Sequence, residues 1–451
     1  MSPAGEAVSA RQRGAGIRGG GAGGGGAIGT RSGIPRGAWV ALAVLSLINL
    51  FNYIDRLVVP AVEESLRHSE LHTTDVQYGW LVSAFLLVYT VSAPLFGGYG
   101  SRPWRLRLLA AGIGVWSLAT AAAGLATSYP ALLAARASVG IGEAAYSAIA
   151  PAVIADLFPA AVRTRAFAVF YAATPVGSAL GYLLGGAVDH RYGWRAAFFV
   201  AGLPGLVLAL AALALADPGP GADAPDGSPT TTAPVPAAAA GFGAYRLLLR
   251  NRPYVRAVLG YAAYTFAIGG IAAWMPAFLI RVRGVPALAA NAQLGGAVVL
   301  TGFVGTFVGG WVGDALTART RAGNLWLSGV TMLLAAPLAA VALTVRAPAL
   351  YWSALIAAEL LIFASTSPIN AVIVADVPAV SRAAAMAGSI LTIHLLGDVP
   401  APLIIARISE QSSLATAVLV IPIAALGCGI IWTYAARQER RRLDGGGRAG
   451  R

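Results

Sequence analysis

The sequence predicts an all-α integral membrane protein whose twelve transmembrane helices form two halves of six. Three observations predict this class. Hydrophobic residues make up 57% of the 451 positions and charged residues only 11%, whereas an average soluble domain carries about 25% charged residues. The apolar residues gather in runs of about 20, the length that spans a bilayer as a helix. The charges lie almost entirely between these runs.

Twelve runs have the length and composition of membrane helices. In the first half they cover residues 38–60, 76–99, 106–127, 130–157, 165–188 and 195–216, and in the second half 254–280, 290–316, 322–345, 348–375, 382–406 and 412–436. The chain is rich in glycine, with 55 residues, and in proline, with 26. Both are tolerated in membrane helices, where small residues let neighbouring backbones approach closely.

A Pro-, Gly- and Thr-rich stretch, "ADPGPGADAPDGSPTTTAPVPAAAAG" (Ala216–Gly241), divides the runs six and six and is typical of a linker. The predicted organisation is a disordered cytoplasmic tail (1–37), a first half (38–216), a cytoplasmic linker (217–251), a second half (252–436) and a basic cytoplasmic tail (437–451). The first tail lacks the apolar core of about 7–15 residues that marks a signal peptide.

The arginines indicate how the chain crosses the membrane. All 32 basic residues are arginine, and most lie in the tails and in the even-numbered connections. Because cytoplasmic loops carry an excess of positive charge, both termini are expected in the cytoplasm of a multi-pass plasma-membrane protein. This topology accounts for the net charge of +13, so no nucleic-acid partner is predicted. The connections on the other side hold only Arg67, Arg191, Arg195, Arg281, Arg283, Arg346 and Arg407.

The two halves share a signal at matching places. The second run ends "PLFGGYGSR" (Pro94–Arg102), and the eighth, which is second in its own half, ends "TFVGGWVGD" (Thr306–Asp314). The match predicts an internal duplication, which is how many secondary transporters are built. Gly97, Arg102 and Asp314 are therefore predicted to gate the protein or to support its structure, although the first of these connections also reads as a simple positive loop.

Several ionisable residues lie inside the apolar runs. A charge at bilayer depth costs a few kcal/mol or more, so such residues face other helices or a water-filled cavity and are candidates for function. They are Asp55, Arg56, Arg136, Glu143, Glu359, His394 and Asp398.

Four of these charges are expected to meet in a cavity between the first and fourth helices. Asp55 and Arg56 point about 100° apart on a helix, so each needs a partner on another helix. Arg136 and Glu143 are two turns apart on one helical face. Buried carboxylates near arginine can titrate, as in proton relays, and arginine is well suited to bind phosphate. The alternative is an ion-pair cluster that only locks the two helices together.

His394 and Asp398 lie four residues apart and share a helical face. They are expected to form a gate or a second protonation site. The alternative is a hydrogen bond that braces a helix broken at Pro400 and Pro402. Glu359 has no evident partner in the sequence and is assigned a structural or gating role.

Four aromatic residues, Tyr171, Tyr264, Trp274 and Phe278, are candidates to line an apolar cavity; the alternative is helix packing or anchoring at the membrane interface. Cys428, the single cysteine, lies in an apolar run, which excludes a disulfide framework and a thiolate metal site. His394 near an acid could suggest acyl transfer, but the sequence contains neither G-x-S-x-G nor H-E-x-x-H. Neither enzyme activity nor a cofactor or metal is predicted.

Five motifs carry a resemblance that spans nearly all of residues 38–436. The tandem layout and the Gly97–Arg107 connection resemble the major facilitator superfamily, and the motifs resemble its Spinster branch of lysolipid and sphingolipid transporters. They are "NYIDR" (Asn52–Arg56), "RASVGIGEAAYSAIAPAVIADLF" (Arg136–Phe158), "YAATPVGSALGYLLGG" (Tyr171–Gly186), "WMPAFL" (Trp274–Leu279) and "HLLGDVPAPLI" (His394–Ile404).

The resemblance implies a secondary transporter whose halves rock around a central cavity, and we expect the protein to act as a monomer. Its expected partners are protons, membrane lipids and a lysophospholipid or sphingosine-phosphate-like amphiphile. The family's proton-coupling acids match Asp55 and Glu143, and the arginines at the polar end of its site match Arg56 and Arg136. Because a fold does not fix the substrate, a drug-like or organic-anion solute is the alternative cargo.

One position departs from the superfamily pattern. The connection between the second and third helices usually carries an aspartate where this chain has Ser101. That aspartate helps to seal the cytoplasmic face. Its loss predicts a weaker inner gate and a more populated inward-facing state.

Overall fold

The computed structural model describes residues 35–97, 99, 102–217, 219, 242–375, 377 and 382–446. Within these residues every regular element is a helix, as predicted. The first half contains α1 (Arg36–Ala61), α2 (Glu63–His68), α3 (Asp75–Gly97), α4 (Arg105–Gly124), α5 (Tyr129–Leu157), α6 (Ala160–Tyr192) and α7 (Trp194–Leu213). All of these except the short α2 are long enough to cross a membrane.

The second half supplies six more spans, several of them built from consecutive shorter helices. They are α10 (Arg252–Arg281), α11 (Ala287–Thr317), α12 (Gly323–Thr344), α13 (Pro348–Ala364) with α14 (Thr366–Ala375), α15 (Arg382–Ile393) with η3 (His394–Asp398) and α16 (Pro400–Gln411), and α17 (Leu414–Ala417) with α18 (Val420–Gly446). The twelve spans confirm the prediction from the apolar runs.

The eleventh span is irregular just before Pro400, whereas the sequence placed the break at Pro400 and Pro402. A π-helical turn, η3, precedes Pro400, and α16 begins at that proline. Proline is tolerated in the first helical turn, where its missing N–H would have no partner, so Pro400 and Pro402 start α16 rather than break it.

The predicted linker and the predicted basic tail both contain helix. A short helix, α9 (Phe242–Arg250), lies within the predicted linker. Arg246 and Arg250 are four residues apart, so they share one face of this helix, and both are exposed. Leu248 points to the opposite face and is buried. The last helix, α18, runs to Gly446 into the predicted basic tail, whose Arg, Gln and Glu residues are good helix formers. Residues 1–34, most of the linker and Ser101 lie outside the described residues.

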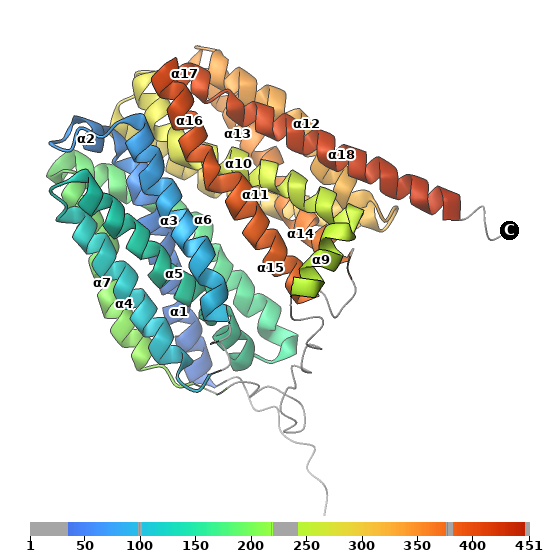
Figure 1. Cartoon of the computed structure of the whole chain (residues 1–451), viewed down its shortest axis with the longest axis horizontal. Helices are drawn as coiled ribbons and strands as arrows, with labels where there is room; N and C mark the ends of the chain where they lie inside the picture. Colours follow the sequence, from blue (N-terminus) through green and yellow to red (C-terminus); the bar gives the residue numbers. More distant parts are fainter. Residues whose placement is uncertain are drawn as a thin grey trace, which may run out of the picture. The chain divides into compact units, whose positions relative to one another are not determined.

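Each half is a tightly packed bundle. In the first half α1 packs along α6, α3 along α5, and α4 against α5 and α7 (Figure 1). Glycine allows close approach between these helices: a Cβ atom added to Gly142 of α5 would lie 2.4 Å from the carbonyl oxygen of Gly112 on α4. In the second half α18 packs against α10 and α12, and α13 against α11 and α12.

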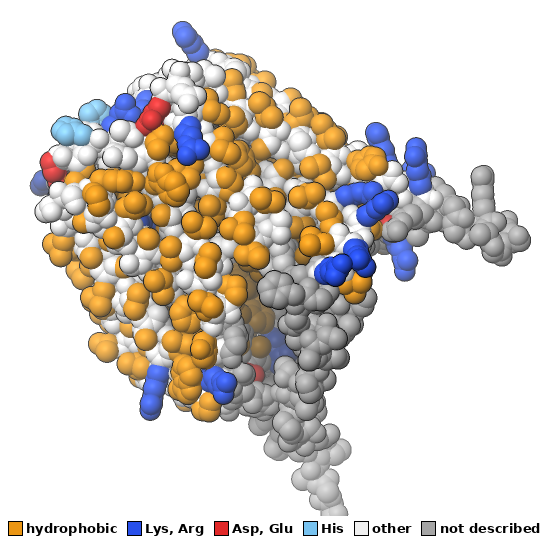
Figure 2. Space-filling model, viewed as in Figure 1, with side chains coloured by type: hydrophobic (Ala, Val, Ile, Leu, Met, Phe, Trp, Pro, Cys, Tyr) orange, Lys and Arg blue, Asp and Glu red, His pale blue; other side chains and the backbone are white. Residues whose placement is uncertain are grey.

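The halves meet chiefly along two helix pairs, α6 with α11 and α3 with α16, and α10 also contacts α1. They converge at the end of the bundle that carries α2 and α17 and diverge toward α9 and the start of α1 (Figure 1). We call these the closed end and the open end. The face seen in Figure 2 is largely hydrophobic, as a lipid-facing surface requires, and it is hollowed between the halves.

Candidate functional site

A cavity of about 380 Å³ lies between the two halves. Helices α1, α3, α5 and α6 line it from the first half, and α10, α11, α13, η3 and α16 from the second. Most of its lining is apolar. The charged or titratable residues of the lining are Arg56, Arg136, Glu359, His394 and Asp398, with Tyr53 and Tyr182 among its aromatic residues.

Asp55 and Arg136 form the deeper of two ion pairs beside this cavity. Arg136 Nη1 on α5 lies 3.0 Å from Asp55 Oδ1 on α1, and both side chains are at most 1% exposed. Thr120 Oγ1 on α4 donates a hydrogen bond of 2.7 Å to Asp55 Oδ2. Arg136 lines the cavity, whereas Asp55 does not. The partner on another helix is as expected, but the carboxylate lies behind its arginine rather than facing the cavity.

Arg56 and Glu143 form the second pair. Arg56 Nε donates to Glu143 Oε2 over 2.7 Å, and here too the arginine lines the cavity while the carboxylate is fully buried. Glu143 Oε1 and Arg136 Nε are buried without a hydrogen-bond partner in the described part of the chain. Buried polar groups are normally satisfied. These two atoms therefore leave hydrogen-bonding capacity for a water, a proton or a ligand at this wall.

Aromatic rings surround the guanidinium group of Arg56. Its central carbon lies 5.1 Å from the ring centre of Tyr53, 5.3 Å from Phe85 and 4.9 Å from Tyr89, distances that allow cation–π attraction. Tyr89 also packs edge-on against His394 of the second half. The sequence interpretation missed these rings, although Tyr53 precedes Arg56 by three residues and so lies on the same helical face.

The second half contributes two polar groups to the cavity. His394 Nδ1 lies 2.9 Å from Asp398 Oδ2 within the π-helical turn, which is the contact that the alternative stated above requires, and a gating or protonation role stays a prediction. Glu359 on α13 accepts a hydrogen bond of 3.0 Å from Thr301 Oγ1 on α11. Its other oxygen, Oε1, is buried without a partner among the described residues.

The structure corrects the expectation for the four aromatic candidates, since none of them is among the lining residues. Trp274 Nε1 donates to Pro402 O over 3.1 Å, and the Tyr264 hydroxyl pairs with Thr366 Oγ1 at 2.6 Å. Phe278 is also fully buried. These three residues pack α10 against its neighbours, which is the alternative stated above. Tyr171 is 53% exposed and stacks on Phe167.

The predicted gating residues of the connections lie at the open end. Gly97 ends α3, and Arg102 and Asp314 are exposed. The buried arginine of this region is Arg105, which forms ion pairs with Asp156 and Asp217 and thereby ties α4 to the end of α5 and to the start of the linker. A gating role for Gly97, Arg102 and Asp314 stays a prediction.

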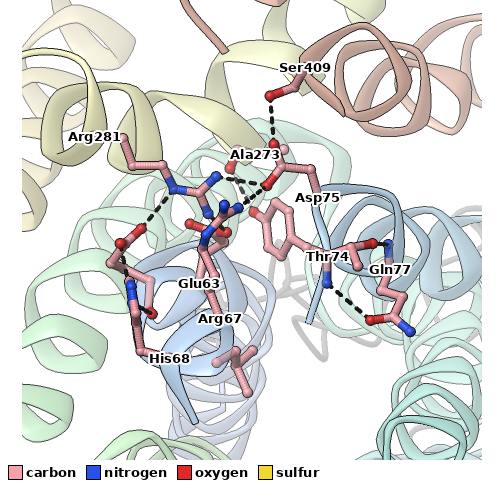
Figure 3. A network of polar contacts seen from close by, with 12 residues as sticks. Glu63, Arg67, His68, Thr74, Asp75, Gln77, Ala273, Arg281 and Ser409 are labelled. Atoms are coloured by element: carbon pink, nitrogen blue, oxygen red, sulfur yellow. Dashed lines mark hydrogen bonds and ion pairs between the residues drawn. The ribbon is translucent and has the colours of Figure 1, made fainter. Parts of the chain in front are cut away.

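An ion cluster that the sequence interpretation missed joins the halves at the closed end (Figure 3). Arg281 at the end of α10 donates to Glu64 Oε2 and to Asp75 Oδ1, each over 2.7 Å, and also pairs with Glu63. Arg67 Nη1 donates to Asp75 Oδ1 over 2.7 Å. We call Glu63, Glu64, Arg67, Asp75 and Arg281 the closed-end cluster. Its sequence signal is "VEESLRH", an acidic run in a chain with few acids.

Further contacts seal the same end. The backbone N–H of Val76 donates to Glu410 Oε1 over 2.9 Å, and the Tyr78 hydroxyl donates to Ala273 O over 2.6 Å. Asn291 Nδ2 donates to Ala61 O over 3.1 Å. All three bonds cross from one half to the other, so the cavity is closed toward α2.

Comparisons with known proteins agree with this architecture. The family model of the Major Facilitator Superfamily matches residues 45–402. "Protein spinster" of Drosophila melanogaster is 31% identical over 399 residues, which are 84% of this chain and 63% of that protein. "Sphingosine-1-phosphate transporter SPNS2" of Xenopus tropicalis is 31% identical over 396 residues, which are 83% of this chain and 74% of that protein.

A solved structure has the same fold. The crystal structure of a bacterial homolog to the human lysosomal transporter Spinster, in an inward-facing and unoccupied conformation, matches with a TM-score of 0.79. The match covers 92% of this chain and 99% of that one, at 23% sequence identity. It supports the helix arrangement, while the sequence relatives above identify the family.

Proposed function

Since the chain belongs to the major facilitator superfamily and, within it, to the Spinster family, we propose that this transporter carries lysophospholipid- or sphingosine-phosphate-like amphiphiles with proton linkage. The cavity between the halves carries this proposal. Its volume of about 380 Å³ falls in the usual range of small-molecule sites, roughly 300–1,000 Å³. Two arginines on one wall and otherwise mostly apolar walls suit a molecule with one anionic head and one long tail.

The arginines are the proposed contacts for the headgroup. Arg56 and Arg136 both line the cavity, and a guanidinium group binds phosphate through paired N–H donors. Arg136 Nε has no hydrogen-bond partner among the described residues, so a phosphate oxygen can take that donor without displacing Asp55. The relatives' names support this class of cargo, since one of them is a sphingosine-1-phosphate transporter.

The carboxylates behind the arginines supply the proposed proton linkage. Glu143 neutralises Arg56, and Asp55 neutralises Arg136. A proton on either carboxylate removes that neutralising charge and leaves the arginine free to hold an anion. Proton binding and headgroup binding therefore favour each other, and this coupling acts equally in both directions.

The proposed cycle is alternating access. With both termini in the cytoplasm, as the arginine distribution predicts, the open end of the cavity faces the cytoplasm and the closed-end cluster faces outward. The halves then rock about the α6–α11 and α3–α16 contacts to expose the cavity on the other side. We place the protein in the plasma membrane, acting as a monomer.

The alternative cargo is a drug-like or organic anion, which Arg56 and Arg136 would also bind. Purified protein in liposomes should take up labelled lysophosphatidylethanolamine above the level of empty liposomes. Unlabelled sphingosine phosphate should compete, and a small organic anion without a tail should not. Uptake of the small anion alone would refute the amphiphile proposal and favour the second class.

A further inference from the structure

The closed-end cluster holds more negative than positive charge. Among the described residues, the three carboxylates of Glu63, Glu64 and Asp75 contact two guanidinium groups, those of Arg67 and Arg281. The imidazole of His68 also lies 3.4 Å from Glu64 Oε1, but it carries a charge only when it is protonated. Ser409 Oγ of α16 adds a hydrogen bond to Asp75 but no charge. One proton would balance the cluster.

Glu63 is the residue best placed to take that proton. Its side chain is 3% exposed, and while Oε1 pairs with Arg281, Oε2 is buried without a hydrogen-bond partner among the described residues. Burial raises the pKa of Glu63 to about 7, an effect that the charge of Arg281 only partly offsets. The charged or titratable groups that face it are Arg281 from α10, Glu64 and Arg67 from α2, and Asp75 and Tyr78 from α3.

The three pairs that Arg281 forms in this cluster exist only while the halves touch. Glu63 belongs to the first half and Arg281 to the second, so separation of the halves at this end breaks the pair and lets water reach the carboxylate. A solvated glutamate has an ordinary pKa of 4.5. The closed state therefore binds the proton more tightly than the open state does, between pH 4.5 and about 7. By linkage, acid stabilises the state with the higher pKa, which is the closed one.

We propose that Glu63 is a proton-binding residue, separate from the central charge pairs, that holds the α2 end of the transporter shut in acid and releases it in alkaline solution. The proton reaches it from the closed-end side, where Arg67, Asp75, Arg281 and Glu410 line a polar surface pocket. Glu63 does not line the central cavity, so it senses pH at the closed end rather than at the cargo site.

The test measures the opening of this end directly and without substrate. Spin labels on cysteines at Thr127 and Gln411, exposed positions on opposite halves, report the distance between the halves in a Cys428→Ser background. In the parent the ratio of closed to open protein should be about tenfold larger at pH 6 than at pH 8. Glu63→Gln, which imitates the protonated form, should stay closed at both pH values.

A matched control lies in the same connection. Glu70 is exposed and pairs with Arg195 inside the first half, so Glu70→Gln should keep the tenfold response. Glu63→Ala, which also removes the carboxylate, should lose it. The proposal is overturned by a parent that opens in acid or ignores pH, or by a Glu63→Gln variant that responds like the parent. None of these outcomes depends on which cargo is carried, so they are distinct from failure of the proposed function.

Discussion

Asp55 and Arg56 are neighbours in the chain, yet each is paired with a different residue of α5. Successive residues of a helix point about 100° apart, so Asp55 reaches Arg136 while Arg56 reaches Glu143. The sequence predicted that each of the two needs a partner on another helix and that Arg136 and Glu143 share one helical face, but it did not assign the two pairs. Which member of each pair would face the cavity did not follow, since that depends on how α1 and α5 are rotated in the bundle.

Because the Asp55–Arg136 pair is buried, we expect two substitutions at this pair to lower the free energy of unfolding by different amounts. Asp55→Asn leaves the buried guanidinium of Arg136 without its counter-charge, which should cost about 3–5 kcal/mol of unfolding free energy. Thr120→Val removes only the hydrogen bond to Asp55 and should cost about 1–3 kcal/mol. Thermal unfolding of the purified variants in detergent gives the order.

The double variant Asp55→Asn with Arg136→Gln provides the control for this set. It removes both charges together and should recover much of the stability lost in Asp55→Asn alone. An Asp55→Asn protein that unfolds at the parent's temperature would show that the pair is not a buried ion pair in solution.

At the scale of elements, the eleventh span shows how an irregular turn builds part of the cavity. The π-helical turn η3 brings His394 and Asp398 to the cavity wall. It packs against α10 through glycine, because a side chain on Gly397 would lie 2.0 Å from Thr265 Oγ1 and 2.7 Å from Ala262 O. The sequence predicted an interruption near Pro400, but not its π-helical form, which depends on this contact with α10.

Gly397→Ala should therefore force η3 away from α10. We expect a destabilisation of about 1–3 kcal/mol, typical of overpacking, together with slower transport because two cavity residues move. The measurements are thermal unfolding and uptake by liposomes. Gly427→Ala on α18 is the matched control, since no atom lies within 4 Å of the added carbon, and it should unfold and transport like the parent. Equal behaviour of the two variants would contradict the close packing of η3.

At the scale of the whole molecule, the twelve spans and the two halves were predictable because apolar length alone defines a membrane helix. The residues that line the cavity were not predictable from the sequence. Trp274 and Phe278 are as apolar as the residues that line it, and only the packing of α10 decides that these two are buried elsewhere. The closed-end cluster was also beyond the sequence. Its partners, Glu63 and Arg281, lie in different halves and meet only in this conformation.

In the proposed coupling, an arginine at the cavity binds an anionic headgroup when the carboxylate behind it takes a proton. The most direct test is uptake of labelled lysophosphatidylethanolamine by liposomes, with and without an imposed pH gradient, for the parent, Glu143→Gln and Glu359→Gln. Glu359 is a cavity carboxylate bonded to Thr301 rather than to an arginine, so its variant controls for simple loss of a buried acid. We expect the gradient to change the initial rate in the parent and in Glu359→Gln, and to change it clearly less in Glu143→Gln, where only Asp55 can still take a proton beside its arginine. A Glu143→Gln protein that responds to the gradient as the parent does would contradict the proposed coupling.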